Sequence, residues 1–281
     1  MKKDVILGTI IGDIVGSRFE LNNNKYGKEF DFFNKNCRFT DDSVMTLAVA
    51  NAFLISNKEY SDLEEKVIES MIEVGRKYPR CGYGHSFYRW IMSEDHKPYG
   101  SFGNGSAMRI SAVGVVANSI DEVKKYSSIV TNVSHNHPDS IKGSEATAIA
   151  IYLALNGKTK EEIKEYIETN YFKIDDLNNN MMKPHYFHIN CIETVKQSLG
   201  AFLESSDYED AIRNAIALGG DSDTIAAITG GIAAAYYGIP EHLCHEGLNY
   251  LDEYLLSIHD TFNNKFMIWK NTSHNTSVLI F

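Results

Sequence analysis

The stretch GGDSDTIAAITGGIAAAYY, residues 219–237, indicates the fold class of this 281-residue chain. Alanine and glycine lie on several faces of the helix expected from residue 222 onward, so neighbouring helices can approach its backbone from more than one side. Gly219 and Gly220 directly precede this helix, and such glycines are typical of the end of the helix before. The pattern favours the centre of a helical bundle, and we expect a single all-α domain over residues 1–281.

Apolar residues recur at helical spacing along most of the chain. Residues 61–77 carry one apolar stripe, and Ser61 with Glu64 has the spacing of an N-terminal capping box. Sustained alternation of period two is nearly absent, so no strands are expected. Further stripes predict helices over residues 41–56, 106–117, 121–131, 139–156, 160–168, 190–204, 207–218 and 241–257.

The N-terminal segment superficially resembles a signal peptide, because basic residues precede an apolar run. Asp4 and Asp13 interrupt that run, and no small-residue cleavage site follows, so we expect a folded first helix. Gly8, Gly12 and Gly16 are four residues apart on this helix. In a membrane the spacing would suggest dimerisation, but the segment is short and carries two aspartates, so tight packing inside the domain is favoured.

Composition limits the class of protein. The net charge of −10 repels polyanions, which argues against bulk binding of nucleic acid or of a membrane surface and leaves a local anion site open. No segment approaches the roughly 18 apolar residues of a membrane span. The four cysteines are far apart and form no C-x-x-C pair, as expected in a reducing compartment. We therefore expect a soluble cytoplasmic protein.

Two acidic clusters begin predicted helices. Thr40-Asp41-Asp42-Ser43 precedes the helix over 41–56, and Asp221-Ser222-Asp223-Thr224 begins the helix over 222–237. Each cluster alone is explained by helix capping and by the helix dipole. Neither contains a Lys or Arg, so four carboxylates brought together would repel one another unless a cation intervened. Carboxylate and hydroxyl oxygens suit Mg2+ or Mn2+.

Three further motifs carry residues suited to ligand binding. YGSFGNGSAMR, residues 99–109, is a glycine-rich loop whose backbone N–H groups can converge on an anion, although it is neither a P-loop nor a dinucleotide fingerprint. SHNHP, residues 134–138, has the H-x-H spacing of a zinc pair but no further ligands nearby, and helix capping by Ser134 or Asn136 also explains it. GDIVGSRFE, residues 12–20, ends on Glu20, which alone reads as a surface charge. Residues 20–40, 78–105 and 169–189 are expected to be long loops that build a site.

These five clusters, in this order, resemble the ADP-ribosylglycohydrolase family. The resemblance runs from the G-D-x-x-G segment at 12–16 to the G-G-D-S-D-T segment at 219–224, and so covers most of the chain. It implies a compact orthogonal helix bundle with two adjacent Mg2+ or Mn2+ ions in a central cleft. It also implies an enzyme that hydrolyses the bond between the terminal ribose of ADP-ribose and an acceptor on a protein or another molecule.

The resemblance also implies residue roles. Asp223 is expected to touch both ions, and Glu20, Asp41 and Asp223 are the expected catalytic residues. Members of the family differ at the position of Glu20. The aromatic segment 80–99 receives no role. The expected metal ligands are Thr40, Asp41, Asp42, Asp221, Asp223 and Thr224, and the expected substrate-binding residues are Gly100, Ser101, Phe102, Gly103, Asn104 and His135.

Two other classes of function stay open on the residues alone. A non-catalytic ADP-ribose-binding or structural protein on the same scaffold would need only the glycine-rich loop, whereas the intact acids favour an enzyme. A metal-dependent phosphoesterase would use the same acids and release phosphate or nucleotide. The acceptor is not determined, since arginine, serine, nucleic-acid and small-molecule linkages share the ADP-ribose half.

Overall fold

The computed structural model describes residues 1–20, 27–174, 176 and 189–273, and these residues are helical without a regular strand. The all-α prediction is confirmed. Two isolated bridges join Lys2 to Ile239 and Gly103 to Asn190. None of the described helices is long and apolar enough to cross a membrane. All four cysteines are free.

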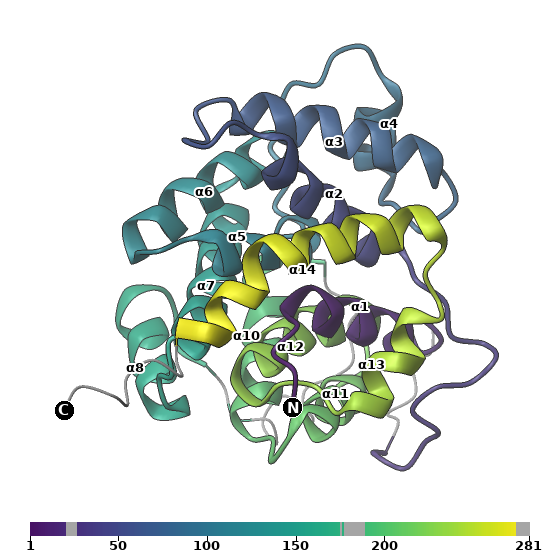
Figure 1. Cartoon of the computed structure of the whole chain (residues 1–281), viewed down its shortest axis with the longest axis vertical. Coiled ribbons are helices and arrows are strands. Elements are labelled where there is room, and N and C mark those ends of the chain that lie inside the picture. Colours follow the sequence, from purple (N-terminus) through teal and green to yellow (C-terminus); the bar gives the residue numbers. More distant parts are fainter. Residues whose placement is uncertain (21–26, 175, 177–188, 274–281) are drawn as a thin grey trace.

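The order of helices follows the predicted stripes closely (Figure 1). The helices are α1 (Val5–Gly16), α2 (Asp41–Ile55), α3 (Leu63–Lys77), α4 (His85–Met92), the 3-10 helix η1 (Asn104–Ser106), α5 (Ser111–Val116), α6 (Ile120–Asn132), α7 (Pro138–Leu155), α8 (Lys160–Asn170), α10 (Cys191–Leu203), α11 (Tyr208–Ala217), α12 (Ser222–Tyr237), α13 (Glu241–Leu248) and α14 (Glu253–Ser273).

Helices α1 and α12 pack against each other in the middle of the molecule (Figure 1). Every residue of α1 is buried. A Cβ atom added at Gly12 would lie 2.0 Å from the backbone oxygen of Ala226, and one at Gly16 would lie 2.5 Å from the Cα of Asp223. The close approach predicted from the glycine spacing is therefore confirmed. It also sets the C-terminal end of α1 beside the acidic start of α12.

Some local predictions differ from the structure. The capping box at Ser61 and Glu64 is wrong: Asp62 precedes α3 without capping it through its side chain, and its carboxylate instead accepts a hydrogen bond from the Asn57 N–H. The apolar stripe of α3 is confirmed, because Leu63, Val67, Met71 and Val74 are buried.

Two predicted helix boundaries and one predicted loop also differ. The expected helix over 241–257 is two helices, α13 and α14, separated by a turn in which Asp252 caps the Leu255 N–H. The expected helix over 106–117 is shorter, since η1 precedes α5. Residues 85–92, placed in a loop by the sequence, form α4, where Phe87 and Trp90 stack with ring centroids 5.6 Å apart.

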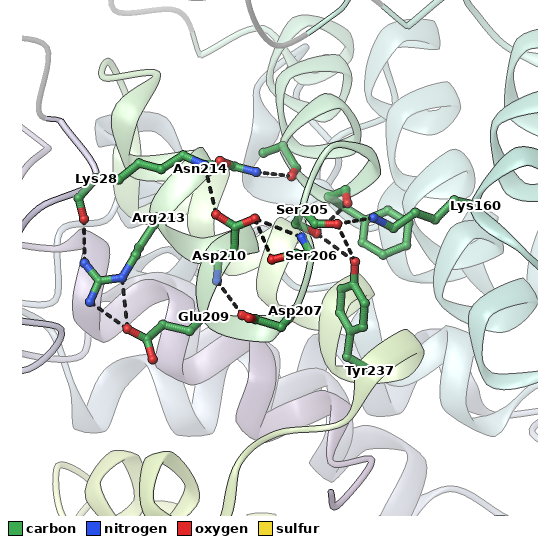
Figure 2. Close-up of polar contacts among 12 residues, drawn as sticks. Lys28, Lys160, Ser205, Ser206, Asp207, Glu209, Asp210, Arg213, Asn214 and Tyr237 are labelled. Carbon is green, nitrogen blue, oxygen red and sulfur yellow. Dashed lines mark hydrogen bonds and ion pairs between the residues drawn. The ribbon is translucent and has the colours of Figure 1, made fainter.

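Figure 2 shows how α11 holds the segment that leads toward α2. Lys28 Nζ lies 2.8 Å from Asp210 Oδ1. Arg213 donates through Nη1 to the backbone oxygens of Lys28 and Phe30, at 2.6 and 2.9 Å. Glu209 accepts from the same guanidinium group. These contacts fix the chain between Lys28 and Phe30, upstream of the acidic start of α2.

On the other side of the same view, Lys160 at the start of α8 caps the end of α10 (Figure 2). Its Nζ donates to the backbone oxygens of Leu203 and Ser205. The ammonium group also lies 5.3 Å from the ring centroid of Tyr237. A cation at a helix C-terminus satisfies free carbonyl groups, which gives this buried contact a structural role.

Candidate active site

A pocket of about 590 Å³ opens where the starts of α2 and α12, the end of α1, α4 and the loop before η1 meet. Thr40 is buried beside the pocket without lining it. The remaining expected site residues all line it: Glu20, Asp41, Asp42, Gly100, Ser101, Phe102, Gly103, Asn104, His135, Asp221, Asp223 and Thr224.

Five carboxylates form two overlapping groups, and all of them except Asp13 line the pocket. In the first group, oxygens of Asp13, Asp42 and Asp223 lie within 4.8 Å of one another. In the second group, the same is true of Glu20, Asp221 and Asp223. Asp223 therefore belongs to both. Each group could hold a metal ion, and Asp41 lies in neither, although it lines the pocket.

Asp13 is the site residue that our sequence reasoning missed. It is fully buried in α1, and its carboxylate accepts hydrogen bonds from the Thr40 N–H at 2.8 Å and the Thr40 hydroxyl at 2.6 Å. It also accepts from the N–H and hydroxyl of Ser43. An acid within an otherwise apolar helix was the available signal, since a buried carboxylate needs partners. Asp13 thereby ties α1 to the start of α2.

The second acidic cluster is placed by a glycine turn. Gly219 and Gly220 both have positive φ angles, +71° and +74°, a conformation that side chains disfavour. The turn directs Asp221 to the loop, where its Oδ2 accepts from Asn104 Nδ2 at 2.6 Å. Thr224 Oγ1 donates to Asp42 Oδ2 at 3.2 Å and so joins the two clusters.

Burial dominates the electrostatics of the cluster. It raises the pKa of Asp13, Asp42 and Asp223, and neighbouring carboxylates raise the pKa values of Asp42 and Asp223 further. The pKa of Glu20 is also raised, first by burial and then by the charge of Asp221, while Arg38 opposes the shift. In addition, Asp42 Oδ1 is buried without a hydrogen-bond partner in the described part of the chain. A bound cation would relieve this repulsion and satisfy that oxygen.

The glycine-rich loop also lines the pocket. The N–H of Gly100 donates to Asn136 Oδ1 at 2.8 Å, and that of Asn104 donates to the Ile189 oxygen at 2.8 Å. Within the described ranges, the N–H groups of Ser101 and Phe102 have no acceptor. Among these residues, the two groups are left available to a ligand. Phe102 is 48% exposed at the pocket mouth.

His135 and α4 complete the wall. The predicted capping of α7 by Ser134 or Asn136 is wrong: the cap is His137, whose Nδ1 accepts from the Asp139 N–H. His135 instead lines the pocket and is 4% exposed. The aromatic segment to which the sequence assigned no role contributes Phe87, which lines the pocket from α4.

Comparisons with known proteins agree on the family. The family model described as ADP-ribosylglycohydrolase matches residues 3–270. "ADP-ribosylhydrolase ARH3" of Homo sapiens is 24% identical, over 80% of this chain and 79% of that protein. "ADP-ribosylarginine hydrolase Tri1" of Pseudomonas putida is 23% identical, over 84% of this chain and 70% of that protein. A solved structure titled "ADP-ribosylglycohydrolase-related protein complex" superposes with a TM-score of 0.67 at 20% identity and covers 93% of this chain and 96% of its own, which shows a shared fold.

Proposed function

The chain belongs to the ADP-ribosylglycohydrolase family, and from this premise we propose that it hydrolyses the bond between the terminal ribose of ADP-ribose and an acceptor. The observation that carries the proposal is the pocket itself. Glu20, Asp42, Asp221 and Asp223 line the same pocket as the glycine-rich loop, in which the N–H groups of Ser101 and Phe102 have no acceptor among the described residues. A ligand that carries a diphosphate for the loop and a reacting sugar for the acids matches this lining.

The donor set fits a pair of Mg2+ or Mn2+ ions. Two oxygen-only groups share Asp223, and an unpartnered buried oxygen of Asp42 lies among them. Hard divalent cations prefer such ligands. We assign Thr40, Asp41, Asp42, Asp221, Asp223 and Thr224 as ligands, and we add Asp13 as a ligand or as the acceptor that orients Thr40. When bound, the ions would supply charge that lowers the pKa of water and orients ribose hydroxyls.

The protein's own groups have distinct tasks in this proposal. Glu20 is partly buried at the pocket, and its raised pKa suits a carboxylate that takes a proton from the attacking water. Asp41 and Asp223 stabilise positive charge on the sugar as the anomeric bond breaks. Asn104 connects the glycine-rich loop to the acids, because its side chain donates to Asp221 while its backbone belongs to the loop.

The loop from Gly100 to Asn104 holds the diphosphate and ribose in this proposal, with Ser101 and Phe102 as the N–H donors. Gly103 is packed closely: a Cβ atom there would lie 3.2 Å from Ser101 Oγ and 3.8 Å from His135 Nε2. Gly103→Val should therefore raise the dissociation constant of ADP-ribose while the metal-dependent rise in melting temperature persists. Unchanged affinity by isothermal titration in the folded variant would make the loop a structural turn.

The experiment that tests the function is release of ADP-ribose from a panel of modified acceptors. Arginine-linked, serine-linked and nucleic-acid-linked substrates, with and without Mg2+ or Mn2+, are compared by chromatographic detection of free ADP-ribose. Metal-dependent release from at least one acceptor supports a hydrolase and identifies the linkage. Binding of ADP-ribose without release from any acceptor would instead support a binding protein, and release of phosphate or nucleotide would support a phosphoesterase.

A further inference from the structure

Arg109 is a buried cation to which the described residues offer no carboxylate partner. It is fully buried, and its Nη2 donates to Ser134 Oγ at 2.8 Å and to the Val130 oxygen at 3.3 Å. Its Nε and Nη1 have no hydrogen-bond partner among the described residues. The guanidinium carbon lies 5.4 Å from the ring centroid of Phe87, which lines the pocket. Burying a charge in this way costs free energy, so we asked what role the hydrogen bond from Arg109 to Ser134 has besides packing.

Hydrogen-bond chemistry gives the contact a direction. Arg109 can only donate, so the Ser134 oxygen accepts from it. Ser134 Oγ also lies 2.8 Å from His135 Nδ1, and the described residues offer its hydroxyl hydrogen no other acceptor. The hydroxyl is fully buried, so its hydrogen is best satisfied by donation to Nδ1. Nδ1 is then an acceptor, and the proton of a neutral ring must sit on Nε2.

The Nε2 atom of His135 faces the glycine-rich loop. A Cβ atom added at Gly105 would lie 3.2 Å from Nε2, and one at Gly103 would lie 3.8 Å from it. Burial lowers the pKa of His135 well below its ordinary value, and the charge of Arg109 lowers it further. The ring is therefore neutral at physiological pH, with a single N–H group available on its pocket side.

We infer that Arg109, acting through Ser134, holds His135 in the Nε2–H tautomer and so makes it a hydrogen-bond donor to an oxygen of the ligand in the pocket. Arg109 and Ser134 are positioning residues, because only His135 faces the ligand. The identity of the ligand rests on the proposed function, in which the accepting oxygen belongs to the ribose or the diphosphate of ADP-ribose.

The tautomer is measured in the free protein, so this test needs neither substrate nor metal. Histidine labelled with 15N is observed by NMR, and His135→Gln identifies the signals of His135. The wild type should show a protonated Nε2 and an unprotonated Nδ1. In Ser134→Ala the Nδ1 resonance should move, because its hydrogen-bond donor is gone, and Ser134→Thr should restore it. Ser127→Ala is the matched control, since Ser127 Oγ is also buried but has no partner in the described part of the chain.

The hydrogen bonds from Arg109 to Ser134 and from Ser134 to His135 form a chain, which we call the relay. Variants at Arg109 test the first residue of this relay, and they remain informative even if Ser134→Ala does not fold. Arg109→Met should raise the pH at which His135 becomes charged, whereas Arg109→Lys, which keeps the charge, should not. A protonated Nδ1 in the wild type overturns the inference. A Nδ1 resonance that is the same in Ser134→Ala and wild type overturns it as well, as does an unchanged titration of His135 in Arg109→Met.

The ligand half of the inference is tested separately by isothermal titration. Ser134→Ala should weaken ADP-ribose binding about tenfold, the scale of one buried hydrogen bond, while the metal-dependent thermal shift stays at the wild-type value. Equal affinity in the two proteins overturns a donor role for His135. Absence of ADP-ribose binding by the wild type would overturn both the proposed function and the donor role of His135. The NMR measurement would still test whether Arg109 and Ser134 set the tautomer of His135.

Discussion

Replacement of Asp223 is the clearest test of the proposed metal site, because its effect on metal binding can be distinguished from an effect on folding. It belongs to both groups of three carboxylates, whereas Asp42 and Asp221 each belong to one. Asp223→Asn keeps the size of the side chain and an oxygen that accepts from the Thr224 N–H, a contact of 3.0 Å in the wild type. The substitution therefore removes one negative charge from both groups and retains an acceptor for the Thr224 N–H in the first turn of α12.

The expected magnitude follows from linkage between binding and folding. A metal at one hundred times its dissociation constant adds about 2.7 kcal/mol to the free energy of unfolding. At about 2–4 °C per kcal/mol for a chain near this size, the melting temperature of the wild type should rise by about 5–10 °C. Asp223→Asn should lose nearly all of this rise, and Asp42→Asn or Asp221→Asn should lose only part of it.

Without metal, the expected effect of Asp223→Asn on the melting temperature has the opposite sign. Burial and then the charges of Asp221 and Asp42 raise the pKa of Asp223, so its ionised form opposes folding near neutral pH. In EDTA, Asp223→Asn should therefore melt at the same temperature as the wild type or above it. Its turnover should fall by at least about a hundredfold, as when a major electrostatic stabiliser is removed.

Differential scanning fluorimetry over a series of Mg2+ and Mn2+ concentrations provides the assay, together with turnover measurements. Ser222→Ala is the control: Ser222 is buried beside Asp223, and its hydroxyl donates to the Gly220 oxygen at 3.3 Å, so all acids are retained. It should keep the metal-dependent rise and turnover close to wild type. A full wild-type rise in Asp223→Asn, or equal small losses of turnover in both variants, would refute the shared-ligand assignment.

Three further expectations concern other parts of the chain. Glu20→Gln should keep ADP-ribose affinity and reduce single-turnover hydrolysis by about a hundredfold or more, the scale of general acid–base assistance; near-wild-type hydrolysis would remove Glu20 from the catalytic residues. Gly12→Ala would place its Cβ 2.0 Å from a backbone oxygen of α12 and should lower the free energy of unfolding by about 1–3 kcal/mol or more in urea titrations. Gly27→Ala is the control and should have little effect, because no described atom lies within 4 Å of the added Cβ. Burial alone would lower the pKa of His259, but its contacts with Asp4, 3.2 Å away, raise it. The contribution of His259 to stability is therefore present below pH 6.5 and is lost as the pH rises through the raised pKa. His259→Gln should flatten this pH dependence of stability, and a profile identical to wild type would contradict the assignment.

The local elements of this protein were largely predictable, because helical periodicity is encoded within short segments. The boundaries of α12 matched the sequence interpretation, and Thr40 caps α2 as expected. Local signals failed where tertiary contacts compete with them. Ser61 and Glu64 have the spacing of a capping box. In the structure, however, the chain before α3 is held by a hydrogen bond from the Asn57 N–H to the Asp62 carboxylate.

The sequence by itself determined the fold class, the close approach of another backbone to the glycines of α1, and the acidic and glycine-rich clusters that line the pocket. Only the tertiary structure decided which of these residues meet. Thr224 and Asp42 are 182 positions apart and hydrogen-bonded, and Asp13 holds the start of α2 from within an apolar helix. Spacing along a chain reports neighbours within a few turns of a helix, whereas contacts across the domain depend on how all the helices pack together. For the same reason, the direction of the hydrogen bonds from Arg109 through Ser134 to His135 could be assigned only from the tertiary structure, which shows the donors and acceptors around each group.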